Sequence, residues 1–382
     1  MTQSERREPG NPASSERGPS GPQGRERKRM NQESYRVIQW ATGSIGQIAI
    51  RHFASNPVYE LVGAYVTSDA KQGVDAGAVA GIDTLGVACT TDKDAILALD
   101  ADCVNYAPLY HDIDDMCAIL RSGKNIVTPV GFAYPPARSP EETARLEAAC
   151  RDGGTSLHGA GIHPGFIGDV FALTGARLMS RVDQVIVSEF YLLAQHPSYE
   201  MNFPGLGFGR DPVDAVENPS PIILNMEEIF RESMTLLAAG LGLDVDEYKY
   251  SLDVSVADHD MTVKSGFVPK GTVAGLHHRW EALVDGAPVL VYQSYARMGD
   301  DITPRYDPGP NRYIVEFVGD EPTRFTLEPV NADMTGDIGY TGRVWTAMSA
   351  INMIPQVVAA PPGIQTHLDL PLGTPRGVVR PR

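Results

Sequence analysis

The chain has few cysteines, no long apolar run and no apolar signal core at its start. The cysteines show no C-x-x-C spacing and lie in apolar or helical contexts, so we expect reduced thiols that act as small core residues. They are Cys89, Cys103, Cys117 and Cys150. No stretch approaches the roughly 18 apolar residues of a membrane helix. We therefore predict a cytoplasmic protein with no membrane partner.

Basic residues are also scarce. The sequence carries 32 Lys and Arg against 48 Asp and Glu, and the resulting formal charge of -16 repels the phosphate backbone of nucleic acids. We expect no nucleic-acid partner. With 382 residues, of which 42% are apolar, the chain is long enough for two domains with a sizeable core.

Residues 1–33 contain almost nothing that a fold could bury. Ordering them would cost conformational entropy without compensating burial, so we predict a disordered tail. The basic run from Arg25 to Arg29 is interpreted as part of this solvated tail, because one short run on a strongly acidic protein makes a poor nucleic-acid arm.

From Tyr35 the sequence alternates short apolar runs with helical periodicity, which is the pattern of a parallel sheet covered by helices. We predict an α/β fold in which residues 34–165 form a doubly wound Rossmann domain. The predicted strands are Tyr35 to Trp40, Glu60 to Val66, Asp102 to Tyr106, Asn125 to Thr128 and Thr155 to His158. The predicted helices are Ser44 to about Ala54, 92–99, Ile113 to Ser122 and Glu141 to Arg151.

Beyond about residue 180 the pattern changes to alternating strands, which predicts a second α+β domain over residues 166–340 with a mostly antiparallel sheet. Its predicted strands are Gln184 to Leu192, Tyr248 to Val256, His277 to Val284, Val289 to Ala296 and Arg312 to Phe317. A long helix from Pro221 to Leu241 packs on it. Residues 341–382 are predicted to form a helix from about Gly342 to Ile354 and a proline-rich end that pack back on the Rossmann domain.

The turn after the first strand has the form of a dinucleotide loop. Such a loop needs a tight turn, a residue without a side chain beside the pyrophosphate, and a small residue where helix meets strand. Ala41, Gly43 and Gly46 occupy these places, so alanine replaces the first glycine of the usual pattern. The following helix N-terminus suits an anion, and a glycine-rich turn without ligand is the alternative. The predicted cofactor residues are Ala41, Thr42, Gly43, Ser44, Ile45 and Gly46.

The end of the second strand lacks the carboxylate that NAD enzymes place on the adenosine ribose about 20 residues after the loop. Thr67, Ser68 and Lys71 stand there instead. Small hydroxyls and a lysine leave room for a 2′-phosphate, so we predict NADP as the cofactor, with NAD as the alternative. Tyr106-Ala107-Pro108 ends the strand whose carboxyl edge borders the nicotinamide in such folds, and we predict that it lines the cofactor.

At this loop, and again at Gly159-x-Gly161-Ile162-His163-Pro164-Gly165-Phe166, the sequence resembles actinobacterial proteins of the dihydrodipicolinate reductase-like group. This group includes relatives of 2,4-diaminopentanoate dehydrogenase and the native amine dehydrogenases. The resemblance extends from about Tyr35 to the ending Ile354 to Ile364. It implies an NAD(P)-binding Rossmann domain and a second α+β domain that completes the active site and builds a homodimer. It also implies hydride transfer to or from a C=N or C=O carbon of a small substrate.

The site residues of that group transfer only in part. The amine dehydrogenases have a glutamate just after the strand that corresponds to Asn125–Thr128, where this chain continues Pro129-Val130-Gly131-Phe132. The diaminopentanoate enzymes have asparagine where this chain has His163. The motif His277-His278-Arg279 is similar to the His-His motif of dihydrodipicolinate reductase, but the following Trp280-Glu281-Ala282 does not match, so no role is transferred.

His163 is the first candidate for the group that exchanges a proton with the substrate heteroatom during hydride transfer. It lies in a loop at the carboxyl end of a strand, where a ring could face the nicotinamide and titrate near neutral pH. The alternative is a histidine bonded to the backbone of a domain-crossing loop. Tyr106 is the second catalytic candidate, with an ordinary strand end as its alternative.

Three other features are weaker signals. His277 and His278 are neighbours on a predicted strand, so their side chains must point to opposite faces of the sheet. The loop from His196 to Arg210 combines aromatic residues with glycines and is interpreted as a substrate lid or, equally, as a plain surface loop. Asp258-His259-Asp260 lacks a further ligand and is interpreted as a polar turn, so we predict no metal.

These features predict an NAD(P)H-dependent oxidoreductase whose substrate the sequence does not identify. Two alternatives stay open. A sugar-type oxidoreductase of the glucose-fructose oxidoreductase kind has Glu-Lys-Pro after the strand where this chain has Thr128-Pro129-Val130. A non-catalytic, cofactor-binding sensor is favoured by the missing glutamate. Turnover of reduced cofactor separates an enzyme from a sensor.

Overall fold

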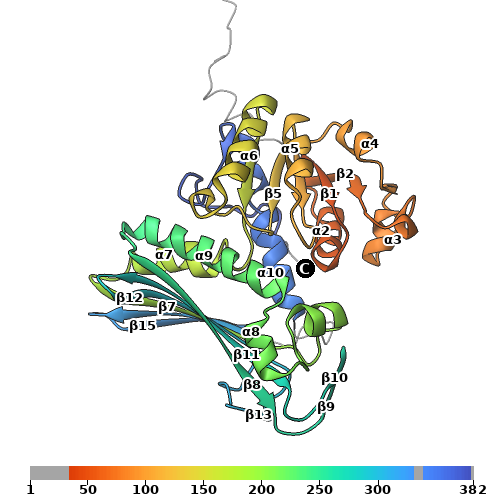
Figure 1. The fold of residues 1–382 in the computed structure, drawn as a ribbon. Helices are drawn as coiled ribbons and strands as arrows, with labels where there is room; N and C mark the ends of the chain where they lie inside the picture. Colours follow the sequence, from red (N-terminus) through yellow and green to blue (C-terminus); the bar gives the residue numbers. More distant parts are fainter. Residues whose placement is uncertain (1–33, 331–338, 380–382) are drawn as a thin grey trace, which may run out of the picture.

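The computed structural model describes residues 34–330 and 339–379, which build two separate large sheets (Figure 1). The tail predicted for residues 1–33 lies outside the described residues. Within the described ranges, no helix is long and apolar enough to cross a membrane.

The first sheet is parallel throughout, with the strand order β16-β6-β5-β4-β1-β2-β3. Its strands are β1 (Tyr35–Trp40), β2 (Tyr59–Tyr65), β3 (Cys89–Thr90), β4 (Cys103–Tyr106), β5 (Asn125–Thr128), β6 (Ser156–Gly159) and β16 (Gly363–Ile364). The order reverses between β1 and β4, so the carboxyl ends of these strands border a crevice of the kind in which Rossmann folds bind a dinucleotide. The predicted Rossmann sheet is confirmed.

Helices cover both faces of this sheet. They are α2 (Ser44–Ser55), α3 (Ala76–Ala80), α4 (Lys93–Leu97), α5 (Ile113–Arg121) and α6 (Pro140–Gly153), with short turns η1 (Asp69–Lys71) and η2 (Pro135–Ala137). Alternate residues of β1 serve opposite faces, because Trp40 packs in one buried cluster with α5 and α6, and Val37 packs in another with α2. All four cysteines are buried with free thiols, which confirms their predicted role as core residues.

The second sheet is mostly antiparallel, with the order β13-β8-β11-β12-β7-β14-β15 and one parallel pair, β12 with β7. Its strands are β7 (Val182–Leu192), β8 (Glu247–Ala257), β11 (Val273–Val284), β12 (Ala287–Arg297), β13 (Ile302–Thr303), β14 (Arg312–Gly319) and β15 (Thr323–Leu327). The predicted turn between β11 and β12 has Asp285 and Gly286 at φ of 52° and 74°, which suits a tight hairpin. A small hairpin, β9 (Met261–Val263) and β10 (Gly266–Val268), stands apart from it.

The long helix α9 (Pro221–Leu241) has the predicted bounds and lies across one face of the second sheet (Figure 1). Ser220 caps its start by accepting the N–H of Ile223, and Gly242 ends it at a φ of 69°. Phe230 stacks on Trp280 of β11 with ring centroids 4.4 Å apart, which fixes the helix on the sheet. Shorter elements complete this part: η3 (Ile167–Phe171), α7 (Ala172–Ala176), η4 (Met201–Gly205) and α8 (Pro212–Glu217).

The C-terminal segment returns to the first sheet. The single helix predicted there is two helices, α10 (Tyr340–Ile351) and α11 (Ile354–Ala359), because Pro355 has no N–H with which to continue α10. α10 packs beside α2, and β16, which the sequence did not predict, adds an edge strand beside β6. Gly363 and Gln365 donate their backbone N–H groups to Thr155 and Leu157 there.

Candidate active site

The turn after β1 has the backbone that a dinucleotide loop needs. Ala41 takes the place of the first glycine at a φ of 70°, in the left-handed region that glycine adopts most easily. At the other end, a Cβ added to Gly46 would lie 2.2 Å from the carbonyl oxygen of Ala41, so glycine is needed for α2 to pack this closely. The loop therefore keeps its tight turn although alanine replaces glycine.

Gly43 borders open space at the N-terminus of α2. A Cβ added to it would meet nothing within 4 Å, no side chain caps the helix, and the first turn holds no acidic residue. A helix N-terminus carries partial positive charge and N–H donors, so this space fits a pyrophosphate.

Lys71 lies against the same loop. Its ammonium group donates to the carbonyl oxygen of Thr42 at 3.2 Å and to the hydroxyl of Thr42 at 3.0 Å. Thr67 and Ser68, which follow β2, are exposed, and so is the acidic Asp69. The structure thus brings the predicted lysine to the cofactor loop at the end of β2, where its charge favours a phosphate.

Two buried amide side chains, which the sequence did not indicate as site residues, bond to the backbone of this loop or to each other. Gln39 donates to the carbonyl oxygens of Trp40 (3.1 Å) and Ala41 (2.8 Å), and Asn105 of β4 donates to the side-chain oxygen of Gln39 at 2.7 Å. Both amides are at most 1% exposed. A polar residue in the middle of an otherwise apolar strand is the signal that could have indicated them.

The second catalytic candidate, Tyr106, lies in the core of the first sheet. It is 1% exposed, packs 6.0 Å from the Trp40 ring and accepts the backbone N–H of Asp112 on its hydroxyl at 2.9 Å. Burial raises the pKa of this phenol above its ordinary value. The hydroxyl thus supports the start of α5, and this placement argues against proton transfer to a substrate. Ala107 and Pro108 follow it at the carboxyl edge of the sheet.

The loop after β5 is held by a carboxylate from α9. Glu232, which is fully buried, accepts the backbone N–H of Tyr134 at 2.8 Å, and its other oxygen lies 3.8 Å from the Arg138 guanidinium. The loop is constrained, because Gly131 and Phe132 have φ of 104° and 65°. Burial raises the pKa of Glu232 to about 7. No local sequence pattern indicates this pair, because its members are 94 positions apart.

His163, the first catalytic candidate, is buried rather than exposed in a cleft. Its side chain is 1% exposed, and its Nδ1 lies 2.6 Å from a carboxylate oxygen of Glu189, whose side chain is 2% exposed. The ring packs edge-on against Phe230 and Tyr292, and Nε2 has no hydrogen-bond partner among the described residues. His163 is therefore placed to act through Glu189.

Glu189 connects His163 to two tyrosines. The hydroxyl of Tyr191 lies 2.9 Å from the other oxygen of Glu189 and 2.9 Å from the hydroxyl of Tyr313. Burial raises the pKa of both phenols above the ordinary tyrosine value, so both stay protonated at neutral pH. The four side chains form one buried chain of hydrogen bonds from the loop after β6 to the strands β7 and β14.

Both tyrosines line a pocket of about 210 Å³ between the second sheet and the first turns of α10. Ile162, Trp345 and Thr346 also line it. The strand ends of the first sheet lie at this pocket, because a Cβ on Gly161 would be 3.6 Å from the Thr346 methyl and 3.8 Å from Pro129. The pocket therefore adjoins the carboxyl ends of β5 and β6.

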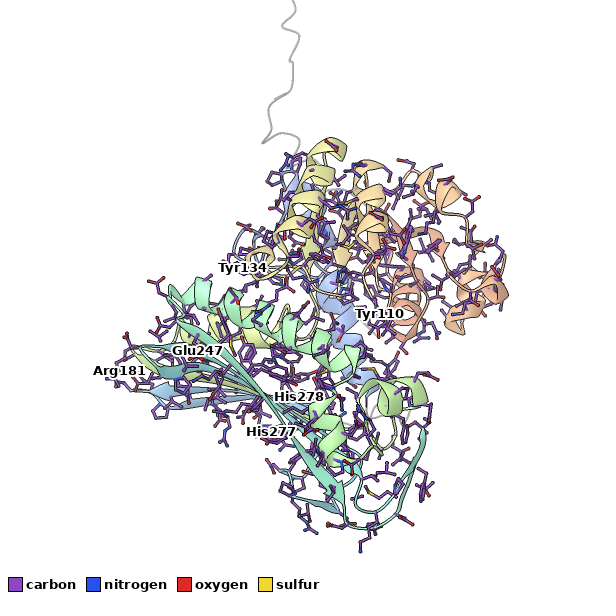
Figure 2. The ribbon with its side chains drawn as sticks, viewed as in Figure 1. Tyr110, Tyr134, Arg181, Glu247, His277 and His278 are labelled. Atoms are coloured by element: carbon purple, nitrogen blue, oxygen red, sulfur yellow. The ribbon has the colours of Figure 1, made fainter. Side chains whose placement is uncertain are left out.

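The loop from His196 to Arg210 borders a further pocket of about 300 Å³, opposite Leu109 and Tyr110 of the loop after β4. Figure 2 shows Tyr110 where the two parts of the molecule meet. The loop is anchored by Asn202, which is buried and donates to the Ser265 hydroxyl at 2.8 Å. Its role as a lid stays a prediction.

His277 and His278 lie on opposite faces of the second sheet, as the strand pattern predicted (Figure 2). His278 is buried on the α9 side and lies 2.9 Å from the hydroxyl of Tyr250. His277 stacks on Tyr295 on the other face, with centroids 4.2 Å apart. In residues 34–330 and 339–379, no cluster of three metal-ligating side chains is found.

Comparison with known proteins agrees with this architecture. The family model of the 2,4-diaminopentanoate dehydrogenase C-terminal domain matches residues 166–379. An amine dehydrogenase of Streptomyces virginiae is 27% identical over 351 residues, which cover 88% of this chain and 96% of that protein. A 2,4-diaminopentanoate dehydrogenase of Acetoanaerobium sticklandii is 24% identical over 251 residues, which cover 65% of this chain and 66% of that protein. The structure of an amine dehydrogenase from Mycobacterium smegmatis superposes with a TM-score of 0.71 at 22% identity over 91% of this chain and 99% of that one, and shares the fold.

Proposed function

The chain belongs to the family of the 2,4-diaminopentanoate dehydrogenase C-terminal domain and is an NAD(P)-dependent oxidoreductase, and we propose that it transfers a hydride to or from a C=N or C=O carbon of a small substrate. The observation that carries this proposal is the pocket beside α10, because it adjoins the carboxyl ends of β5 and β6 in a sheet whose first loop fits a dinucleotide. In Rossmann enzymes the nicotinamide lies at this edge.

The cofactor would be held by the loop from Ala41 to Gly46, with its pyrophosphate beside Gly43 at the start of α2. When bound, the nicotinamide supplies or accepts the hydride. We propose NADP as the preferred form for two reasons. Thr42 holds Lys71 at the loop, and the small, exposed side chains of Thr67 and Ser68 leave space after β2. A lysine beside a 2′-phosphate gains a charge-assisted contact that NAD does not offer.

The substrate would bind among Ile162, Trp345 and the tyrosines Tyr191 and Tyr313. The pocket walls are mostly apolar, and the phenol oxygen of Tyr313, at the end of the hydrogen-bonded chain, is the polar group placed for the substrate heteroatom. A volume of about 210 Å³ suits a small substrate. Acyclic or cyclic carbonyl compounds with few carbon atoms, and the imines formed from them with ammonia, fit this description.

Steady-state oxidation of NADPH and NADH tests the proposal. The assay offers a panel of small aldehydes and ketones, each with and without ammonium, and also runs the reverse direction with the matching amines and alcohols. Turnover that requires ammonium identifies imine chemistry, and turnover without it identifies carbonyl chemistry. Tight cofactor binding with no turnover in either direction would instead support the sensor.

We also propose a homodimer built on the open face of the second sheet. α9 covers one face, and the other face carries a polar network in which Arg279 bonds to Glu281 at 2.6 Å and to Gln293 at 3.2 Å. Such a face of regular strands suits a second copy of the same chain. Sedimentation analysis checks the dimer, and a monomer at all concentrations would contradict it.

A further inference from the structure

We propose that Tyr313 and Tyr191 pass the proton that the substrate heteroatom gains or loses, and that Glu189, positioned by His163, stores this proton between reactions. This inference rests on the proposed function and adds a proton path to it.

The hydrogen-bond geometry gives the path its direction. His163 lies 2.6 Å from one oxygen of Glu189, Tyr191 lies 2.9 Å from the other, and the two phenol oxygens are 2.9 Å apart. A hydroxyl has a single proton, so when Tyr191 donates to the carboxylate, Tyr313 must donate to Tyr191. The oxygen of Tyr313 is then left to accept a proton at the end of the chain, and both tyrosines line the substrate pocket.

The surroundings of His163 indicate which ring nitrogen donates to Glu189. Nε2 has no hydrogen-bond partner among the described residues, and it faces Gly168, where an added Cβ would lie 2.2 Å away. A proton on Nε2 would be buried without an acceptor, which is costly, so we assign the donating N–H to Nδ1, which faces the carboxylate. Nδ1 then donates to Glu189 and holds the carboxylate in place.

The proton movements balance in both directions. In oxidation the substrate C–H bond gives its hydride, with two electrons, to the oxidised nicotinamide. The heteroatom gives its proton to Tyr313, Tyr313 gives its own to Tyr191, and Tyr191 gives its own to Glu189, which becomes a neutral carboxylic acid. The carbon–heteroatom double bond forms from the electron pair of the broken heteroatom–hydrogen bond. After the product leaves, the proton returns through the same two tyrosines to water in the vacated pocket, which restores the carboxylate for the next oxidation. Reduction runs every step in reverse.

A buried carboxylate is well suited to store this proton. Glu189 is 1% exposed, and its two oxygens are bonded to His163 and Tyr191, so it exchanges protons only through the chain. The competing donor is His196, which also lines the pocket. An experiment must therefore separate a path through the tyrosines from direct transfer by His196.

The test compares single-turnover hydride transfer, in light and heavy water, with a substrate that the panel assay has identified. Tyr313→Phe, Tyr191→Phe and Glu189→Gln should each lower the rate constant of hydride transfer about 10²-fold or more, with unchanged affinity for the cofactor. Tyr250→Phe is the matched control, because this tyrosine bonds to His278 on the same sheet outside the pocket, and it should keep full activity. His196→Asn should lower this rate constant far less than Tyr313→Phe does, whereas direct transfer by His196 predicts the reverse order.

A second pair of variants tests the positioning role of His163. Asparagine places an N–H donor near the position of Nδ1, so His163→Asn should recover part of the kcat that His163→Ala loses. In the wild type, the rate constant measured in light water should differ from that in heavy water, and Tyr313→Phe should change the ratio of the two. Full activity of folded Tyr313→Phe, Tyr191→Phe and Glu189→Gln, or loss only in His196→Asn, would overturn the proton path while leaving the oxidoreductase intact. A wild type without any turnover would overturn the proposed function, and the path with it.

Discussion

Glu232 should make the protein less stable as the pH rises towards neutrality. The groups that face it are the guanidinium of Arg138 at 3.8 Å, the backbone N–H of Tyr134 at 2.8 Å and the carboxyl group of Asp169, which repels it. Burial outweighs the attraction of Arg138 and raises the pKa of Glu232 from 4.5 to about 7. The folded protein therefore holds a proton there that the unfolded chain has already released.

The size of the effect follows from this difference. Between pH 4.5 and about 7 the folded state binds more protons than the unfolded state, so the free energy of unfolding falls with rising pH and levels off above 7. From 4.5 to about 7 is about 2.5 pKa units, and at about 1.4 kcal/mol per unit the full loss is about 3.5 kcal/mol.

Urea unfolding at pH 5 and pH 8, for the wild type and Glu232→Gln, measures this loss. Glutamine keeps an oxygen for the N–H of Tyr134 but carries no charge, so the wild type should lose about 2.5 kcal/mol more than the variant between pH 5 and pH 8. Burial lowers the pKa of His158 to about 3 and of His367 to about 4, and these groups add stability as the pH rises. Both proteins share them, so they cancel in the comparison. Equal pH slopes would refute a buried, protonated Glu232.

Three further predictions concern the cofactor loop and the first sheet. Gly43→Val should abolish binding of NADPH, measured by its fluorescence, without lowering the melting temperature, because the added side chain enters only the space left for the pyrophosphate. Unchanged affinity would place the cofactor elsewhere. Lys71→Ala should weaken NADPH at least about 10-fold and NADH much less, and equal losses would contradict a contact with the 2′-phosphate. Tyr106→Phe should cost about 1 kcal/mol of stability, because the N–H of Asp112 loses its acceptor, while kcat stays unchanged. A large loss of kcat in this variant would restore Tyr106 as a catalytic residue.

The fold could be predicted from the sequence because its main signals are local. The helix from Pro221 to Leu241 was predicted with its observed bounds, since Pro221 begins it and Gly242 ends it. Ten strands of the two sheets were predicted to within four residues at each end from their apolar runs and alternation, whereas the short edge strands β3, β13 and β15 were missed. The strand β16 was missed because two residues of a proline-rich segment show no periodicity, and only pairing with β6 makes them a strand.

The buried polar network was harder to predict, because its members come together only in the fold. One local signal was present: Val185, Val187, Glu189 and Tyr191 share a face of β7, so a charged residue stands in a row of buried positions. The sequence singled out His163 but could not show its partner, which is 26 positions away. Glu232 contacts Tyr134 and Arg138 only because α9 packs against the loop after β5 in the folded protein. No local pattern in the sequence predicts this contact.

The addition of β16 beside β6 also has a consequence for biosynthesis. When the ribosome has released the chain only as far as β6, the edge of the first sheet at β6 has no partner strand, because β16 is not yet made. Without α10, the side chains around Val127 are also partly uncovered. Exposed strand edges and apolar faces of this kind invite aggregation. The first sheet therefore reaches its final form only after the last part of the chain has emerged, and a truncated N-terminal half would depend on chaperones for its solubility.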